Sequence, residues 1–207
     1  MLYDPSYIED IEVTNEDILH FCSVDLVESA MKQAHSKMIE KFEKVNGTIV
    51  FDPNVRLPLW EDPEACRQAI LEFIPKANVV KVSDEELEFI TGIKDETKAI
   101  QSLFKGNVVV VIYTKGPKGA QAFTKNKFTI EHQGYKVKAI DTTGAGDAFI
   151  GAVISRILTS DMIDVAQLFE NEGKSILKFG NKVAALTTTR YGAIESLPTI
   201  EEVNKEY

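Results

Sequence analysis

One stretch of this chain decides its fold class: Asp141-Thr142-Thr143-Gly144-Ala145-Gly146-Asp147-Ala148-Phe149. Three small residues separate two aspartates where an apolar helical pattern begins. Small residues let the backbone approach a ligand, and the N–H groups and positive dipole end of a helix attract anions. The stretch therefore predicts a helix over about 147–158, with room for a phosphoryl group beside Asp147.

Two interpretations of this stretch are open from the residues alone. In the first, the glycines form a tight turn and Asp147 is a carboxylate that helps to start the helix. In the second, Asp147 accepts a proton from an attacking alcohol while backbone amides hold the phosphoryl group.

Outward from this stretch, short apolar runs alternate with helical patterns. Strands are expected at 18–22, 48–51, 78–82 and 108–114, helices at 25–42, 63–73, 84–91, 97–103 and 164–186, and a hairpin at 120–124 and 127–131. This rhythm predicts an α/β fold with a mainly parallel sheet covered by helices. Residues 1–16 show no regular spacing of apolar residues and are expected to form a loop. No repeat or linker interrupts the chain, so we expect a single domain over 1–207.

Composition narrows the possible partners. The chain has 207 residues, 44% of them hydrophobic, and a net charge of −9 that repels nucleic acid and acidic membrane surfaces. A phosphate ligand therefore needs local geometry and a cation. Its apolar runs are too short to span a bilayer and no signal peptide is evident, so we expect a cytoplasmic protein. Two lone cysteines argue against a disulfide framework or a zinc site.

A second motif, residues 114–119, reads Thr114-Lys115-Gly116-Pro117-Lys118-Gly119 and follows a predicted buried strand. Turns at the carboxyl edge of a parallel sheet are where α/β proteins bind ligands. A Gly-x-x-Gly turn is also common in ordinary loops, and the spacing here is not that of a P-loop.

Two polar clusters follow other predicted strands. Ser83 and Glu86 fit a capping box, and a carboxylate at a helix start near phosphates also suits a magnesium ion. Residues 51–60 place Asn54 and Arg56 after a strand, where a guanidinium can meet a phosphate or a sugar oxygen. The same segment also reads as a proline-shaped turn with Trp60 packed on the core.

These motifs together resemble those of the PfkB (ribokinase-like) carbohydrate kinases. Residues 141–149 are similar to the second family signature at every position, 114–119 resembles the Thr-x-Gly-x-x-Gly nucleotide loop, and 83–86 resembles Asn-x-x-Glu with serine in place of asparagine. Residues 181–193 resemble the helix end that borders the adenine. The resemblance implies a ribokinase-like three-layer sandwich.

The resemblance also implies residue roles. Asp147 becomes the catalytic base, which also binds the acceptor sugar, and an anion hole is formed by the backbone of Gly144, Ala145 and Gly146. Nucleotide contacts are expected at Thr114, Gly116, Gly119, Asn181, Gly192 and Ser83. Glu86 is expected to hold Mg²⁺ through water, Asp141 and Thr143 to help bind a monovalent cation such as K⁺, and Asn54 and Arg56 to bind the substrate.

The activity implied is ATP-dependent phosphorylation of a sugar's primary hydroxyl. Residues 87–92 are similar to bacterial fructokinases in particular, which makes fructose the expected acceptor. Residues 51–60 are equally typical of 2-keto-3-deoxygluconate kinases, so that acceptor or another sugar stays open. A nucleotide-binding remnant without turnover is a further alternative.

The resemblance begins part-way into the family's fold. The first, glycine-rich signature, the first strands and the small β lid have no counterpart here, so the N-terminal part of the sugar site is expected to be missing. Phosphoryl transfer needs the acceptor held in line and water kept out. This chain alone is therefore expected to be weak or inactive as a kinase. The oligomeric state stays open, with a homodimer as one alternative for a full-length form.

Overall fold

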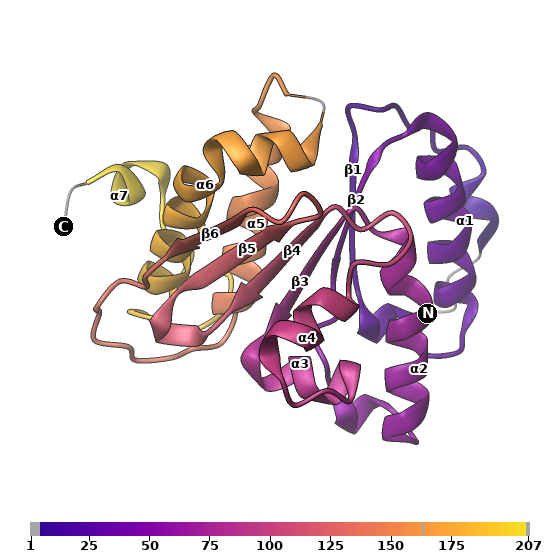
Figure 1. Cartoon of the computed structure of the whole chain (residues 1–207), viewed down its shortest axis with the longest axis horizontal. Helices are drawn as coiled ribbons and strands as arrows, with labels where there is room; N and C mark the ends of the chain where they lie inside the picture. Colours follow the sequence, from indigo (N-terminus) through magenta and orange to yellow (C-terminus); the bar gives the residue numbers. More distant parts are fainter. Residues whose placement is uncertain (1–4, 163, 206–207) are drawn as a thin grey trace. The chain divides into compact units, whose positions relative to one another are not determined.

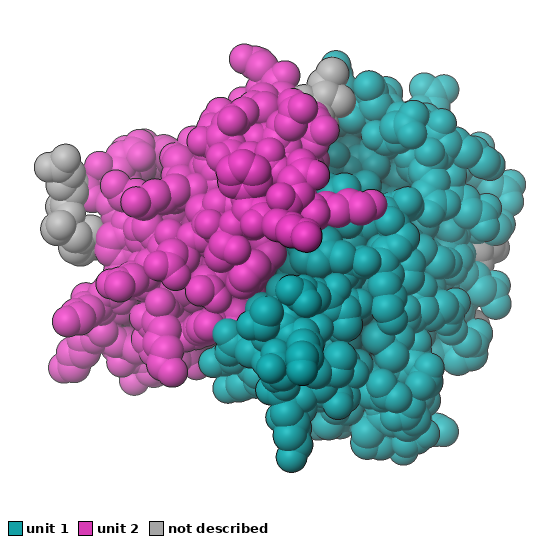
Figure 2. Space-filling view, viewed as in Figure 1, with its two compact units in different colours: residues 1–112 teal, residues 113–207 magenta. Residues whose placement is uncertain are grey.

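A computed structural model describes residues 5–162 and 164–205 of the chain. The chain divides into two compact units, residues 1–112 and residues 113–207, which are coloured separately in Figure 2. Each unit is described by itself below. The single kinase domain expected over 1–207 stays a prediction.

Six strands form a sheet in the order in which they follow one another along the chain. They are β1 Ile18–Cys22, β2 Thr48–Asp52, β3 Val79–Ser83, β4 Val110–Thr114, β5 Ala120–Thr124 and β6 Thr129–His132. β1, β2 and β3 pair in parallel, with Phe21 opposite Phe51 and Phe51 opposite Val80, whereas β5 and β6 form an antiparallel hairpin. The predicted α/β fold with a mainly parallel sheet is confirmed.

The first unit packs its helices around an aromatic core. They are α1 Ala30–Val45, α2 Pro63–Phe73, α3 Asp84–Thr91 and α4 Glu96–Ser102, and Figure 1 shows α1 and α2 beside β1 and β2. The Phe21 ring stacks on Phe51 with centroids 4.6 Å apart and meets Phe73 edge-on at 6.0 Å. Large aromatic surfaces buried in this way dominate the energetics of a core.

The helix predicted over 25–42 begins later than expected. Ser23–Leu26 forms a short 3-10 helix, and α1 starts after Ser29, whose hydroxyl accepts a hydrogen bond from the Lys32 N–H. A serine N-cap satisfies a helix donor that has no partner within the helix. Part of the predicted leading loop is also ordered as a 3-10 helix, Pro5–Ile8, and Lys41 donates to the Glu9 and Ile11 carbonyls. Residues 1–4 of that prediction lie outside the described residues.

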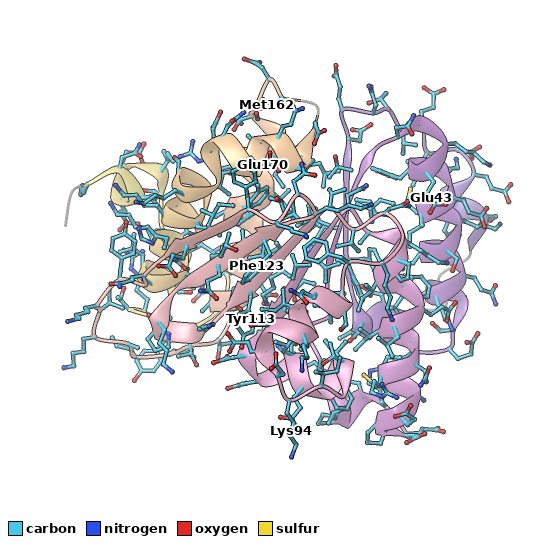
Figure 3. All side chains as sticks on the ribbon, viewed as in Figure 1. Glu43, Lys94, Tyr113, Phe123, Met162 and Glu170 are labelled. Carbon is cyan, nitrogen blue, oxygen red and sulfur yellow. The ribbon has the colours of Figure 1, made fainter. Side chains whose placement is uncertain are left out.

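The second unit covers the hairpin with helices. They are α5 Ala145–Leu158, α6 Val165–Thr187 and the short α7 Ile200–Asn204. A Cβ at Gly180 of α6 would lie 2.9 Å from the Phe149 ring of α5, so the missing side chain lets the two helices approach closely. Glu170 of α6, labelled in Figure 3, accepts hydrogen bonds from Thr124 and Asn126 of the hairpin.

Within residues 5–162 and 164–205, none of the helices combines the length and the apolar character needed to cross a membrane.

Candidate functional site

The start of α5 is fixed by a glycine in a left-handed conformation. Gly144 is the N-cap, with φ of 78°, and its carbonyl accepts the Ala148 N–H at 2.8 Å. A Cβ at this position would lie 3.0 Å from the Ala193 Cβ and 3.1 Å from its Cα. Both the positive φ and the close contact with Ala193 disfavour a side chain here. The backbone of this turn is therefore bare where the helix presents its first amides.

Asp141 fastens this turn to the segment after α6. One carboxylate oxygen accepts the Thr143 N–H at 2.9 Å and the other accepts the Gly192 N–H at 3.1 Å. The Ile140 N–H donates to the Thr188 carbonyl at 2.7 Å. Hydrogen bonds from the Thr143 side chain and amide, and then from the Gly192 amide, lower the pKa of Asp141 below its usual value. The structure thus brings together three predicted site residues, Asp141, Thr143 and Gly192.

Asp147 lies in the first turn of α5 and is exposed. With Gly144 it lines a cavity of about 490 Å³, whose other walls come from α5, from Phe179 and Val183 of α6, and from the segment that includes Ala193 and Ile194. No residue of the 114–119 turn is among those lining this cavity. The carboxylate at position 147 and the bare turn at Gly144 therefore open onto the same space.

The 114–119 turn is tightly built. Gly116–Lys118 forms a 3-10 helix, and the Lys115 N–H donates to the Gly119 carbonyl at 2.8 Å. Gly119, with φ of 99°, leaves no room for a side chain, since a Cβ there would lie 2.2 Å from the His132 carbonyl oxygen. Thr114 is half-buried at the end of β4, and Gly116 is exposed. The predicted nucleotide turn therefore rests on the end of β6.

Asn181, a predicted nucleotide contact, is buried on α6 with its amide nitrogen engaged by the protein itself. That nitrogen donates to the His132 carbonyl at 2.9 Å and lies 3.1 Å from His132 Nδ1. His132 is not among the site residues predicted from the sequence. No local pattern links a residue on a strand to one that lies 49 positions further along on a helix.

In the first unit, Glu86 joins two loops. Its carboxylate accepts hydrogen bonds from the Val55 N–H at 2.7 Å, the Ser83 N–H at 3.0 Å and the Ser83 hydroxyl at 2.8 Å. The predicted capping box at the start of α3 is present. Glu86 also holds the turn after β2 against α3, a contact that the capping pattern alone does not predict.

The substrate candidates lie in that turn after β2. Asn54 has a left-handed backbone, with φ of 46°, and Arg56 is exposed with its Nη1 donating to the Val55 carbonyl. Trp60 is half-buried, and its indole N–H is buried without a hydrogen-bond partner among the described residues. The predicted packing role of Trp60 agrees with this placement.

A buried ion pair at the end of β2 was not predicted. Lys81 Nζ lies 3.1 and 3.0 Å from the two carboxylate oxygens of Asp52, and their side chains are 7% and 2% exposed. A lysine within the otherwise apolar run of β3 was the signal in the sequence, because charged side chains are almost never buried unless they are paired. Asp52 lies one residue before Pro53, which begins the turn that carries Asn54.

The metal sites expected from the resemblance can be compared with these contacts. Among the described residues, no group of three or more His, Cys, Asp and Glu side chains is arranged to hold a metal ion. The three hydrogen bonds that Glu86 accepts fit a magnesium ion held through water rather than directly. Asp141 fits a monovalent cation, because each of its oxygens accepts one N–H and keeps further lone pairs.

The family comparison agrees with this arrangement of motifs. The model of the pfkB family of carbohydrate kinases matches residues 4–200. The chain belongs to that family.

The chain is most informatively compared with fructokinases. It is 37% identical over 205 residues to fructokinase-2 of Solanum lycopersicum, covering 98% of this chain and 61% of the relative. A fructokinase double mutant from Vibrio cholerae, solved with fructose, ADP and potassium, superposes with a TM-score of 0.87 at 30% identity over 98% of this chain and 63% of that one. An ATP-bound fructokinase from Xylella fastidiosa gives a TM-score of 0.82 at 26% identity, over 90% and 59%. The chain therefore spans about three fifths of the length of these proteins.

Replacing Lys81 tests the buried ion pair. Lys81→Met leaves Asp52 charged and buried, and should lower the free energy of unfolding by about 3–5 kcal/mol. Lys81→Met combined with Asp52→Asn should recover most of this loss, because no uncompensated charge remains. Urea unfolding measures both effects, with the exposed Lys94→Met as the matched control. A loss no larger than that of the control would show that the pair is not buried as described.

Replacing Asp141 tests whether its carboxylate holds the turn before α5 to the segment after α6. Its pKa is lowered in the folded protein, so the charged form adds stability above about pH 4 and this contribution disappears as pH falls through the lowered pKa. Asp141→Asn should therefore unfold at lower urea concentration than the parent at neutral pH, and the difference should narrow in acid. Asp161→Asn, at an exposed position, serves as the control. A difference that is independent of pH would contradict the assignment.

Proposed function

We propose that this chain carries the ATP-binding and phosphoryl-transfer part of a kinase that phosphorylates a primary hydroxyl of a sugar, with fructose as the acceptor. The observation that carries the proposal is the start of α5. There a bare left-handed turn at Gly144 and the exposed carboxylate of Asp147 open onto one cavity. Helix N-termini of this kind stabilise anions through N–H groups and the helix dipole.

Each residue of the turn has a role in the proposed reaction. The amides of Gly144, Ala145 and Gly146 hold the oxygens of the γ-phosphoryl group as charge develops on them, and the Ala145 N–H, which donates to the Thr142 carbonyl at 3.2 Å in this structure, must leave that carbonyl to do so. Asp147 accepts the proton of the sugar hydroxyl while the oxygen of that hydroxyl forms the new bond to phosphorus. The bond from phosphorus to the β-phosphate oxygen breaks, and ADP leaves with its electron pair. The position of Asp147 one residue after this turn suits both events.

The nucleotide and the ions are assigned to further residues of the chain. Thr114, Gly116 and Gly119 hold ATP in the turn after β4, and Ser83 and Gly192 are further contacts. Magnesium, when bound, shields the phosphate charges, and Glu86 orients it through water. Asp141 and Thr143 would hold a monovalent cation such as potassium, whose positive charge would offset part of the negative charge of the phosphates. The Vibrio cholerae fructokinase was solved with potassium bound, which supports this part of the proposal.

The acceptor is assigned from the relatives and from the turn after β2. Both the plant and the bacterial relatives are fructokinases. Asn54 and Arg56 lie in that turn, and their side chains can bind a sugar oxygen or a phosphate. An acceptor such as 2-keto-3-deoxygluconate would need the same base and the same anion hole. A cytoplasmic location and a homodimer in a longer form of the protein stay predictions.

Two assays on the chain test the proposal. Calorimetry should detect binding of magnesium ATP, and a coupled assay should detect ADP release that depends on fructose rather than on 2-keto-3-deoxygluconate. Because the chain spans about three fifths of its relatives, turnover is expected to be slow. Binding without sugar-dependent ADP release would identify a nucleotide-binding protein without turnover, and absence of both would overturn the proposal.

Replacing Asp147 separates binding from chemistry. Asp147→Asn should lower sugar-dependent ADP release by about 10²–10⁴-fold, the usual contribution of a general base, while ATP binding stays within a few-fold of the parent. Glu172→Gln, at an exposed position on α6, is the matched control and should change neither. Sugar-dependent turnover that survives in Asp147→Asn would remove Asp147 from the role of base.

A further inference from the structure

His132 and Asn181 form a contact that the proposed reaction does not use directly. His132 ends β6, and Asn181 is buried on α6 with a residue exposure of 7%. The side-chain nitrogen of Asn181 lies 2.9 Å from the His132 carbonyl oxygen and 3.1 Å from His132 Nδ1. One amide group therefore meets both the backbone and the ring of the same histidine.

This geometry determines the protonation of the histidine. A backbone carbonyl can only accept, so the atom of Asn181 beside it is the NH₂ group and the orientation of the amide is fixed. The same NH₂ group faces Nδ1, so Nδ1 must offer its lone pair. The ring proton then lies on Nε2 and the imidazole is neutral. A protonated ring would set an Nδ1–H against the N–H of Asn181.

The end of β6 in turn supports the predicted nucleotide turn. Ala120, directly after the turn, pairs with His132 in the β5–β6 ladder. A Cβ at Gly119 would lie 2.2 Å from the His132 carbonyl oxygen, and one at Gly134 would lie 2.3 Å from the Pro117 carbonyl oxygen. These contacts leave no space for even a methyl group. A shift of His132 must therefore move the turn.

We propose that Asn181 and His132 are positioning residues for the nucleotide turn at 114–119: Asn181 holds neutral His132 against α6, and His132 fixes the turn that receives the phosphates of a nucleoside triphosphate. This inference rests on the proposed function. It replaces a direct contact of the Asn181 amide nitrogen with the base by an indirect role. It also makes nucleotide affinity depend on the charge of one histidine.

The surroundings of His132 favour the neutral form. Partial burial lowers its pKa first, and the positive charges of Lys178 and Lys174 on α6 lower it further, against a smaller opposing effect of the Gln133 backbone. The Tyr135 ring lies 5.6 Å from the imidazole. At neutral pH the His132 imidazole is therefore neutral and its contact with Asn181 is formed. The affinity for the nucleotide should fall only when the medium becomes acidic enough to protonate His132.

Nuclear magnetic resonance of the imidazole nitrogens tests the geometry without any nucleotide. The chain has three histidines, so His132→Gln identifies the His132 signals. The expected result is an Nε2–H tautomer that titrates below the usual histidine pKa of about 6.5. Asn181→Asp places a carboxylate beside Nδ1 and should raise that pKa. An Nδ1–H tautomer, or a pKa at or above the usual value in the parent, would overturn the inference.

Binding of magnesium ATP at about pH 8 and about pH 5.5 tests the consequence for the nucleotide. The phosphates of ATP also titrate in this range, so His132→Gln supplies the reference and His20→Gln, at an exposed position, the control. Between the two pH values the affinity of the parent and of His20→Gln should fall at least about threefold more than that of His132→Gln.

Equal falls in all three proteins would overturn the positioning role while leaving the proposed function intact. No binding to any of them at about pH 8 would instead contradict the proposed function.

Discussion

The start of α5 in the second unit depends on a glycine whose left-handed backbone and close contact with Ala193 disfavour a side chain. Gly144 adopts a left-handed conformation against Ala193, and Asp141 ties the same turn to Gly192. Because both contacts reach the segment after α6, the start of α5 is held from a part of the chain some fifty residues away. The amides of the first turn are therefore fixed in place before any ligand arrives, which is what stabilisation of a developing charge requires.

In the first unit, charged side chains hold the turn that carries the predicted substrate residues. The Glu86 carboxylate accepts the Ser83 N–H at the start of α3 and the Val55 N–H of the turn after β2. Lys81 pairs with Asp52, the residue directly before Pro53. A buried pair of this kind adds little to stability compared with apolar residues, yet removing one partner is costly. In this chain Asp52 lies at the end of β2, where the following turn leaves the sheet. Asn54 and Arg56 are carried by that turn.

The sequence was most informative where the chemistry is local. The Gly-Ala-Gly turn, the capping box of Ser83 with Glu86 and the hairpin of β5 and β6 each depend on residues that are near one another in the sequence. The corresponding elements were predicted close to their observed bounds. The start of α1 was misplaced because Ser29, a good N-cap, lies inside a longer apolar pattern. Helix α7 was missed because it has only five residues.

Contacts between distant segments could not be predicted in the same way. Asn181 with His132, Asp141 with Gly192 and Lys81 with Asp52 join residues 29 to 51 positions apart, and no local pattern specifies which side chains the fold brings together. The resemblance to a kinase family named Asn181 and Gly192 as site residues. Their observed partners, however, are a histidine and an aspartate of the same chain.

A crystal structure of the chain with magnesium ATP would test the central claim most directly. The account predicts the terminal phosphate within hydrogen-bonding distance of the amides at the start of α5, with the Asp147 carboxylate on the side from which an acceptor hydroxyl would approach. A terminal phosphate bound elsewhere in the second unit, with those amides facing only solvent, would contradict it.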